Sequence, residues 1–598
     1  MSAQEPAPKL GLALSGGGHR AAFFHIGVLA RLAELGLLRR VGVMSTVSGG
    51  SIVGALYYLY VKGLLERKPN AEITDEDYVE IVQRLESSYR AGMAENLRGR
   101  ALSNYPANFR LVSPTFSRTD RIAELYERFF YRPVLPGEGR IDMNDLLISP
   151  RGDDGAPISP FDPREDADKV RNAPVPILLI NATTLNTGHN WRFEATWIGE
   201  PELKGVHDAD VDKNVHLLQW RRQALPPDQQ KRALGTAVAS SACFPGGFAP
   251  VSIRNLFARK PPSGEPEPYV VQLVDGGVRD NQGIDALIDM GCRRLIISDG
   301  SGQMQDLALP PTRLPALLRR VSSITGKESR EQRVLRTYAD DQLQVVFLHL
   351  QTGLPARSLC PLGAGSIPDW PPEPEPPAVG PEQTKLHPDA QRLVGQMRTD
   401  LDAFSDLEAS SVMEVGYRVS RAVLAADTSG LRAGAVEAPA PDWRFHVVGK
   451  LLEAPTDDYL RHLRVARRRF FKAPAYRLDP VARRFRRAIS LRVRKVVGFV
   501  LGLAAIAALV VGGLAIAGSS IPAAVVYAVG VGIAMVFVMY VGSGIPGLRT
   551  PSRVVLDVAL PLLGALLPLW LLGLSQLRSG KSHRRLGPDG YEPGHAAR

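Results

Sequence analysis

Residues 9–65 read KLGLALSGGGHRAAFFHIGVLARLAELGLLRRVGVMSTVSGGSIVGALYYLYVKGLL. The short apolar segment 9–15 predicts a buried strand, and the apolar residues of segment 21–36 recur at helical spacing. The pattern then repeats, because segment 41–48 predicts a second strand and segment 49–65 a second helix. Strands that alternate with helices in this way indicate an α/β fold with a central, mostly parallel sheet.

The alternation continues downstream to about residue 426. Further strands are predicted at 174–188, 269–277, 293–302 and 343–350. Further helices are predicted over 314–339 and 389–426. Two segments rich in proline, 135–175 and 361–385, are predicted to be loop insertions.

The positive charge of the chain is concentrated in one segment. The 598 residues are 45% hydrophobic and 22% charged, which excludes a disordered chain, and the net charge is +11. Segment 461–495 reads RHLRVARRRFFKAPAYRLDPVARRFRRAISLRVRK and directly precedes a long apolar tract. A basic segment beside such a tract is typical of a juxtamembrane region attracted to anionic headgroups. A solvated basic helix and an RNA-binding tail are the alternatives.

The apolar tract predicts membrane spans. Segments 497–517 and 521–541 each contain 21 residues without a charge, which is long enough to cross a bilayer. A third segment, 554–574, contains Asp557 and two prolines, and it either spans, re-enters or lies at the interface. Because positive residues stay inside, we expect a multi-pass membrane protein whose N-terminal part is cytoplasmic. Two buried core helices are the alternative to the two uncharged spans.

The sequence therefore divides into five parts. We predict a tail (1–8), an α/β domain (9–430), a basic juxtamembrane linker (431–496), a transmembrane region (497–577) and a polar tail (578–598). The three cysteines, Cys243, Cys292 and Cys360, are far apart and suggest neither a disulfide framework nor a metal site.

The first chemical motif is a glycine turn between the first strand and helix. Gly16, Gly17 and Gly18 precede His19 and Arg20. Glycines let the backbone approach a ligand closely, and the N-terminus of a helix adds a positive dipole. Such a turn can bind a phosphate or an oxyanion, or it can be a simple tight turn. Neither a P-loop sequence nor the G-x-G-x-x-G fingerprint is present.

The second motif is TVSGG, residues 46–50, between the second strand and its helix. It resembles the nucleophile elbow G-x-S-x-G, with Ser48 at the position of the nucleophile. Gly50 matches the second glycine of this motif, and Thr46 replaces the first. The alternative is that Ser48 only caps the helix. Other serines nearby lack the elbow frame.

The third motif is Asp275 with two following glycines, at the end of the strand YVVQLVD. Open α/β sheets place their sites at such strand ends, although a DG turn is also common. Neither His19 nor His25 lies in a sequence motif that would make it the histidine of a Ser-His-Asp triad. A direct Ser48–Asp275 dyad is therefore the simplest scheme for nucleophilic catalysis.

Five blocks in this order resemble the patatin-like phospholipases, over roughly residues 8–305. The blocks are GGGHRAAFFHIGVL (16–29), STVSGGSIVGAL (45–56), NATTLNTGHNWRF (181–193), ASSACFPGGFAPV (239–251) and DGGVRDNQGIDAL (275–287). Ala21, Thr46 and Gly283 depart from the family pattern. Residues 398–420 also resemble the closing helices of bacterial members.

The resemblance implies a three-layer α/β/α domain and a serine lipid-acyl hydrolase. Ser48 would form an acyl-enzyme, and Asp275 would act as base and later activate water. Residues Gly16 to Arg20 would form the oxyanion hole, with Arg20 orienting the loop or binding a lipid phosphate. The resemblance also implies a membrane lipid as substrate and no metal or organic cofactor. From the predicted spans and the basic segment beside them, we expect a location in a bacterial inner membrane and no nucleic-acid partner.

Two other functions remain open at the level of sequence. The departures at Ala21 and Thr46 leave room for a non-catalytic lipid-binding or scaffold protein on the same fold. The arginine-rich segment 461–495 suggests a nucleic-acid-binding membrane protein, although no recognition module accompanies it. Acyl-chain preference and oligomeric state are not predicted.

Overall fold

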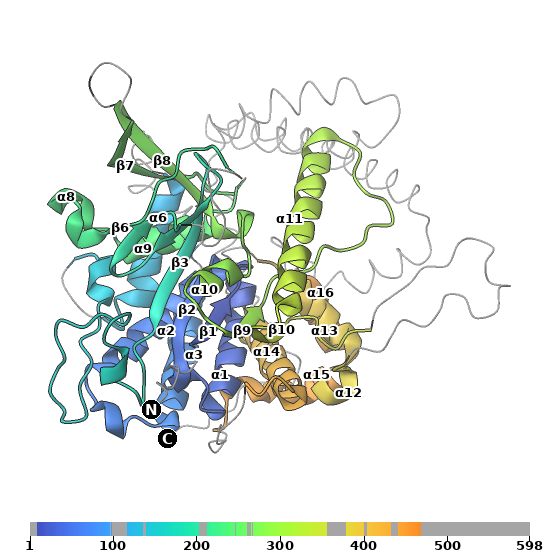
Figure 1. The fold of residues 1–598 in the computed structure, drawn as a ribbon. Helices are drawn as coiled ribbons and strands as arrows, with labels where there is room; N and C mark the ends of the chain where they lie inside the picture. The colour runs from blue at the N-terminus through green and yellow to red at the C-terminus, as the bar shows by residue number, and fades with distance from the viewer. Residues whose placement is uncertain are drawn as a thin grey trace, which may run out of the picture. The chain divides into compact units, whose positions relative to one another are not determined.

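A ten-stranded sheet runs through the part of the chain that the computed structural model describes (Figure 1). The described residues are 9–95, 97, 117–135, 139–202, 212–245, 247–259, 265, 267–355, 378–399, 403–431 and 441–467. The strands are β1 (Leu10–Leu14), β2 (Val41–Val47), β3 (Ile177–Thr184), β4 (Asn190–Phe193), β5 (Trp197–Gly199), β6 (Trp220–Arg221), β7 (Val251–Arg259), β8 (Glu267–Asp275), β9 (Arg294–Asp299) and β10 (Gln344–His349). The helices are α1 (Gly18–Glu34), α2 (Gly49–Leu65), α3 (Asp75–Ala94), α6 (Arg118–Tyr126), α8 (Pro227–Gln230), α9 (Leu234–Ala242), α10 (Ile284–Asp289), α11 (Leu314–Ala339), α12 (Pro381–Thr384), α13 (Pro388–Gly395), α14 (Asp406–Ala426), α15 (Gly449–Glu453) and α16 (Asp457–Ala466).

The centre of the sheet is parallel and one side of it is antiparallel. The strand order is β10-β9-β1-β2-β3-β4-β5-β6, and β8 pairs with both β3 and β7. Every neighbouring pair from β10 to β3 is parallel. The pairs beyond β3, and the pair of β3 with β8, are antiparallel. The predicted central parallel sheet is therefore confirmed, and the antiparallel strands extend it.

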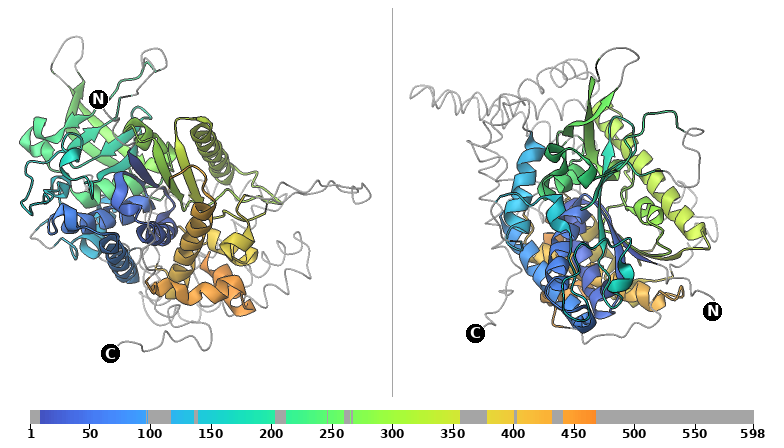
Figure 2. Two further views of the ribbon diagram at one scale, coloured as in Figure 1. Left: turned by 60° about the horizontal axis from the view of Figure 1, so that its bottom comes forward. Right: turned by 60° about the vertical axis from the view of Figure 1, so that its left-hand side comes forward.

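Successive residues of the central strands pack against opposite layers of helices. Leu12 and Leu14 of β1 join the core beneath α1, α2 and α14, whereas Ala13 joins the core beneath α10. This alternation is the period of two that a strand imposes on its side chains. In Figure 2, α11 lies on the side of the sheet opposite to α1–α3. The three-layer α/β/α arrangement follows from strands that are apolar on both faces.

Helices α1 and α14 cross so closely that their backbones are in direct contact. A Cβ on Gly27 would lie 1.9 Å from the carbonyl oxygen of Met413, and one on Gly416 would lie 2.3 Å from that of Phe24. Glycine is therefore required at both positions of this crossing. The crossing holds α1, which starts at the glycine turn, firmly against α14.

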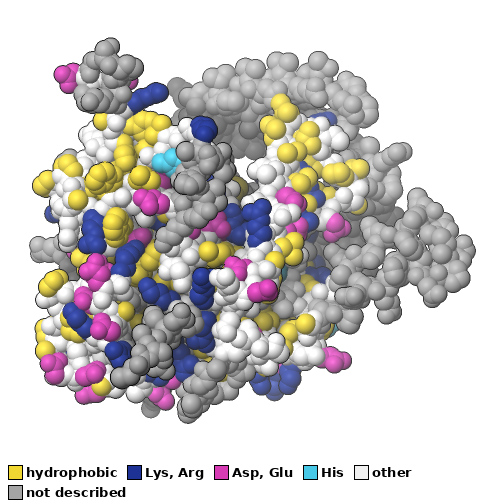
Figure 3. All heavy atoms as spheres, in the orientation of Figure 1, with side chains coloured by type: hydrophobic (Ala, Val, Ile, Leu, Met, Phe, Trp, Pro, Cys, Tyr) yellow, Lys and Arg dark blue, Asp and Glu magenta, His cyan; other side chains and the backbone are white. Residues whose placement is uncertain are grey.

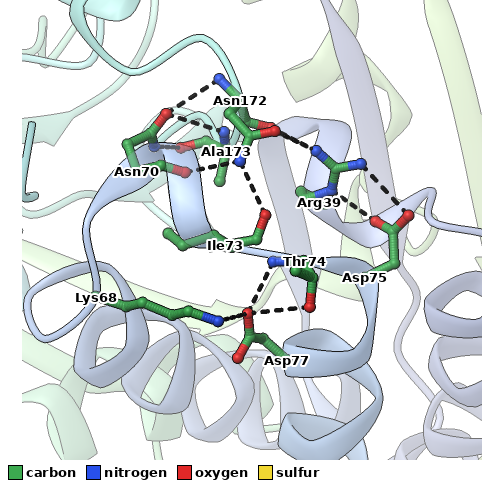
Figure 4. A network of polar contacts seen from close by, with 9 residues as sticks. All are labelled: Arg39, Lys68, Asn70, Ile73, Thr74, Asp75, Asp77, Asn172 and Ala173. Atoms are coloured by element: carbon green, nitrogen blue, oxygen red, sulfur yellow. Dashed lines mark hydrogen bonds and ion pairs between the residues drawn. The ribbon is translucent and has the colours of Figure 1, made fainter. Parts of the chain in front are cut away.

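The end of the predicted loop 135–175 is fixed by side-chain amides. Asn172 donates from Nδ2 to the carbonyl oxygens of Asn70 (2.7 Å) and Ile73 (2.9 Å), and its backbone N–H donates to Asn70 Oδ1 (Figure 4). Arg39 donates both to Asn172 and to Asp75. Buried backbone groups must find partners, and these amides supply them where the chain enters β3.

Two of the predicted segments differ from the structure. The predicted helix 389–426 is two helices, α13 and α14, separated by residues 396–405. Residues 449–466, which the sequence places in a basic linker, form α15 and α16, and the side chains of Leu452 and Tyr459 are buried in the core.

The predicted multi-pass membrane localisation is contradicted. Within the described ranges, no helix combines the length and the apolar character needed to cross a bilayer. The longest helix that they contain, α11, has 26 residues but carries six Arg or Lys and two Glu. Helix α2 is apolar, but its 17 residues are fewer than the roughly 20 that a span requires. The predicted spans 497–517, 521–541 and 554–574 lie outside the described residues.

Candidate active site

The pairing of three strands brings the two candidate catalytic residues together. Val47, the last residue of β2, pairs with Asn181 of β3, and the next residue of β3, Ala182, pairs with Asp275 of β8. Ser48 follows Val47 directly, so it meets Asp275 across the carboxyl end of β3. Asp275 arrives on an antiparallel strand, which the sequence did not predict, but the site still lies at the carboxyl end of the parallel strands, as expected.

Ser48 occupies a strained turn between β2 and α2. Its φ is +50° and its ψ is −116°, a conformation that residues with a Cβ rarely adopt. The nucleophile elbow is known for such a strained strand-to-helix turn. Ser48 is 8% exposed, and its backbone N–H donates to the hydroxyl of Ser241 at 2.9 Å. The turn therefore has the backbone of an elbow and not that of an ordinary serine N-cap.

The two glycines after Ser48 are required by close packing. A Cβ on Gly49 would lie 2.1 Å from the carbonyl oxygen of Gly18, and one on Gly50 would lie 2.2 Å from that of Leu14. These contacts press the start of α2 against the glycine turn.

Thr46 replaces the first glycine of the elbow without distorting it. Its hydroxyl donates to the carbonyl oxygen of Leu179 at 3.0 Å and accepts a hydrogen bond from Ser51. Its methyl group lies against Gly54, where a Cβ would come within 2.6 Å of it. The Thr46 side chain thus packs between β3 and α2, and the position tolerates it because residue 54 is glycine.

Asp275 is a buried carboxylate that the strand pairing places beside Ser48. It is 4% exposed, and its Oδ1 accepts the N–H of Gly277 at 2.7 Å. Burial raises the pKa of Asp275 to about 6, although hydrogen bonds from Gly277 and from the Ser48 side chain act in the opposite direction. A carboxylate with a pKa near 6 is a stronger base than an exposed aspartate and is still ionised at neutral pH.

The glycine turn lies directly beside Ser48. A Cβ on Gly16 would lie 3.2 Å from the Ser48 Cβ. Gly17 and Gly18 adopt φ values of 138° and 61°, and α1 begins at Gly18. The first N–H groups of a helix have no partner within it, so those of this turn are candidates for an oxyanion hole. The N–H of Gly16 is not, because it donates to the carbonyl oxygen of Asn281 at 2.9 Å.

The side chains of His19 and Arg20 have other partners. The Nδ1 of His19 lies 2.6 Å from the Tyr89 hydroxyl. Arg20 is buried, and its Nη1 donates to the carbonyl oxygens of Gly395 and Met397 at 2.8 and 2.9 Å. Of the two predicted roles for Arg20, these contacts fit the orientation of the loop. Burial lowers the pKa of Arg20 to about 10, which leaves it charged at neutral pH.

His25 is not positioned to act as a base on Ser48. Its Nε2 lies 2.9 Å from the carbonyl oxygen of Ser15, and its Nδ1 lies 2.7 Å from the hydroxyl of Ser298. Both ring nitrogens are therefore occupied, and burial lowers the pKa of His25 to about 4. The neutral ring ties α1 to β1 and β9.

Two residues whose role was not predicted from the sequence lie next to the candidate pair. Ser241 of α9 accepts the Ser48 N–H and donates to the carbonyl oxygen of Asn181 at 2.6 Å. The Oδ1 of Asn281 lies where a Cβ on either Gly16 or Gly277 would collide with it, at 2.3 and 2.5 Å. Asn281 thus lies between the glycine turn and the Asp275 loop. Its position within the DGGVRDN block was the only signal in the sequence.

Comparison with known proteins identifies the domain that carries this site. The family model described as patatin-like phospholipase matches residues 12–288. No curated protein matches the sequence.

Solved structures give weaker likenesses. Human GIVD cytosolic phospholipase A2 has a TM-score of 0.35 and 12% identity, over 72% of this chain and 64% of that chain. Its complex with methyl γ-linolenyl fluorophosphonate and terbium chloride has a TM-score of 0.34 and 16% identity, over 71% and 60%. VipD from Legionella pneumophila has a TM-score of 0.25 and 12% identity, over 98% and 94%. The sequence spans less than two thirds of the human chain.

The family model includes the glycine turn, the elbow and the Asp275 loop. The part of the chain that carries the candidate site, residues 12–288, is therefore a patatin-like phospholipase domain.

Proposed function

We propose that the chain cleaves carboxylic ester bonds of membrane phospholipids with Ser48 as nucleophile and Asp275 as base. The observation that carries this proposal is the strained turn that holds Ser48 at a φ of +50°, at the place where the strand pairing brings it beside the buried Asp275. The family of residues 12–288 supports lipid hydrolysis in general. The dyad and the substrate are the parts that the proposal adds.

In the proposed reaction, the Ser48 oxygen attacks the ester carbonyl while its proton passes to Asp275. The carbonyl oxygen becomes an oxyanion, which accepts hydrogen bonds from backbone N–H groups at Gly17, Gly18 and His19. The intermediate expels the lyso-lipid alkoxide, which takes the proton from Asp275, and the acyl group remains on Ser48. Asp275 then removes a proton from water as the water oxygen attacks the acyl-enzyme. When this second intermediate collapses, the fatty acid leaves and Asp275 returns the proton to the Ser48 oxygen, which regenerates the hydroxyl.

The exposed side chains of α11 favour a substrate that lies in an anionic lipid surface. Exposed apolar side chains follow one stripe of its first half, at Leu314, Leu318, Val321 and Ile324. In Figure 3, apolar side chains lie along this helix. The helix carries six Arg or Lys against two Glu. Amphipathic helices of this composition bind anionic bilayers through both properties.

Arg330 and Arg333 attach the second half of α11 to the rest of the domain. Arg330 pairs with the buried Asp299 at 3.2 Å, and Arg333 pairs with Asp285 at 2.9 Å. The first half carries the exposed apolar stripe and is available for a lipid surface in this proposal.

The experiment measures release of fatty acid from phospholipid vesicles by the purified chain. Ser48→Ala and Asp275→Asn are expected to lose activity by at least about 1,000-fold, as removal of nucleophile or base does in other serine hydrolases. Ser252→Ala, at an exposed residue of β7, is the matched control and should keep full activity. Full activity in Ser48→Ala would overturn the dyad. If the wild-type chain binds vesicles but releases no fatty acid, the proposal is wrong and the hypothesis of a non-catalytic lipid-binding protein replaces it.

A further inference from the structure

Three potential metal ligands converge outside the candidate active site. His189 lies just before β4, and Asp212 and His216 lie in the segment before β6. One ligand atom from each of the three lies within 4.8 Å of the other two. We propose that these three residues bind one divalent transition-metal ion, with Zn²⁺ as the ion that best fits the ligands.

A buried carboxylate orients the first ligand. Glu200 is 1% exposed, and its Oε2 lies 3.0 Å from His189 Nδ1. The same carboxylate accepts the N–H of Leu217 at 2.9 Å and the hydroxyl of Thr184 at 2.8 Å. These bonds hold Glu200 as an acceptor, which assigns the Nδ1 hydrogen to His189 and leaves its Nε2 to bind a cation. Metal-binding histidines usually donate their other ring N–H to a carboxylate in this way.

His189 also contacts a second carboxylate, that of Asp212. Its Nε2 lies 2.8 Å from Asp212 Oδ2. Two such acceptors approach each other when a proton or a metal ion lies between them. A proton would need only His189 and Asp212, whereas a metal ion also accounts for the convergence of His216, whose ring stacks on that of His189 with a centroid separation of 4.5 Å.

The ligand types and their spacing fit zinc. Two imidazoles and one carboxylate are a common set in zinc sites with an open fourth position. Bonds of about 2.0–2.2 Å in a tetrahedral site separate the ligand atoms by about 3.4 Å. Ligand atoms already within 4.8 Å need only small side-chain movements to reach this separation.

The surroundings leave room for a fourth ligand. A cavity of about 150 Å³ adjoins His189 and His216, and its wall also includes Asn190, Arg279 and Asp285. Water in this cavity can complete the coordination of a metal ion. Asp212 is partly exposed, which gives an ion access from solvent.

The proposed metal site is coupled to the loop that carries Asp275. Arg279, four residues after Asp275, donates from Nη1 to the carbonyl oxygen of Gly188 at 2.8 Å. Gly188 directly precedes His189. The ion would therefore hold the β3–β4 turn in place and, through Arg279, support the Asp275 loop. It would have a positioning role and would not touch the substrate.

The test uses the untagged full chain, from which bound metal has been removed with a chelator. Zinc is titrated into this protein and its binding is measured by isothermal titration calorimetry. Wild-type protein is expected to bind one equivalent of Zn²⁺, and the Co²⁺ form to show the visible absorption of a tetrahedral site. His216→Ala and Asp212→Asn should lose saturable binding. Glu200→Gln should bind about 10- to 100-fold more weakly, because its role is to orient His189.

His446→Ala is the matched control, since His446 pairs with Glu414 at 2.7 Å, is not among the three converging ligands and should not contribute. Circular dichroism of each variant checks folding, and Asp212→Asn, at a partly exposed position, keeps the test valid if His216→Ala fails to fold. Equal zinc binding by wild type and Asp212→Asn would overturn the proposal, as would no binding by wild type. The readout is metal binding, so it is independent of ester hydrolysis.

Discussion

Replacing Asp275 with asparagine should remove activity and, at the same time, make the protein more stable. The pKa of Asp275 is raised from 3.8 to about 6 by burial, a difference of about 2 units. At about 1.4 kcal/mol per unit, ionising this group in the folded protein costs about 3 kcal/mol more than in the unfolded chain.

The sign of the effect depends on pH. Below about pH 4 the carboxyl is protonated in both states and contributes no penalty. Between about pH 4 and pH 6 the unfolded chain ionises first, so the free energy of unfolding falls as pH rises. Above pH 6 the full penalty is present. Asparagine keeps a carbonyl oxygen that can accept the Gly277 N–H. It lacks the charged oxygen that faces Ser48, and this loss reduces the expected gain in stability by about 1 kcal/mol.

We therefore expect Asp275→Asn to raise the free energy of unfolding by about 2 kcal/mol at pH 8 and by nothing at pH 4. Urea denaturation at both pH values measures this free energy, with Asp341→Asn, at an exposed residue of the turn before β10, as the control. In the wild type, kcat/KM should fall below an apparent pKa of about 6 as Asp275 takes up a proton. The argument that Asp275 is a desolvated base would be refuted if Asp275→Asn were less stable than the wild type at pH 8. It would also be refuted if the increase in the free energy of unfolding were the same at pH 4 and pH 8.

Three further predictions concern the turn and helix α11. Ser48→Gly should abolish activity and raise the free energy of unfolding by about 1 kcal/mol in urea denaturation, because glycine relieves the strain at φ +50°; a loss of stability would argue against strain. Gly49→Ala should lower activity strongly, because its Cβ would lie 2.1 Å from the Gly18 carbonyl oxygen, while Gly63→Ala on the same helix meets no atom within 4 Å and should be tolerated; equal activity of the two would contradict the packing argument. Leu318→Asp with Val321→Asp should weaken sedimentation with anionic vesicles, whereas Ser322→Asp with Ser323→Asp, which adds the same charge at exposed positions of the same helix, should weaken it less; equal effects would leave charge alone as the explanation.

The parts of the fold that sequence predicted are those set by local pattern. Apolar runs located β1, β2, β3, β8, β9 and β10, and the prediction for α11 agrees with its bounds. The break between α13 and α14 was missed because apolar residues keep helical spacing through it. A signal was present, since Ser405 and Glu408 form a capping box at the start of α14. The short strands β4 to β6 were missed because strands of two to four residues carry almost no period.

The candidate site was predicted from the order of its motifs, and its geometry was not. The sequence proposed Ser48 and Asp275, but the antiparallel pairing of β8 with β3, which brings them together, depends on contacts between distant segments. For the same reason Ser241 could not be assigned, because its contact with Ser48 joins residues 193 positions apart. His189, Asp212 and His216 likewise lack a recognisable spacing and converge only in the folded chain.

The most direct test of the central claim is covalent trapping of Ser48. A fluorophosphonate probe reacts with a serine whose hydroxyl is activated by a neighbouring base, and mass spectrometry of the digested protein locates the adduct. We predict one adduct, on Ser48, that is absent in Ser48→Ala and forms much more slowly in Asp275→Asn. An unlabelled wild-type protein, an adduct on another serine, or equal labelling rates in wild type and Asp275→Asn would contradict the account.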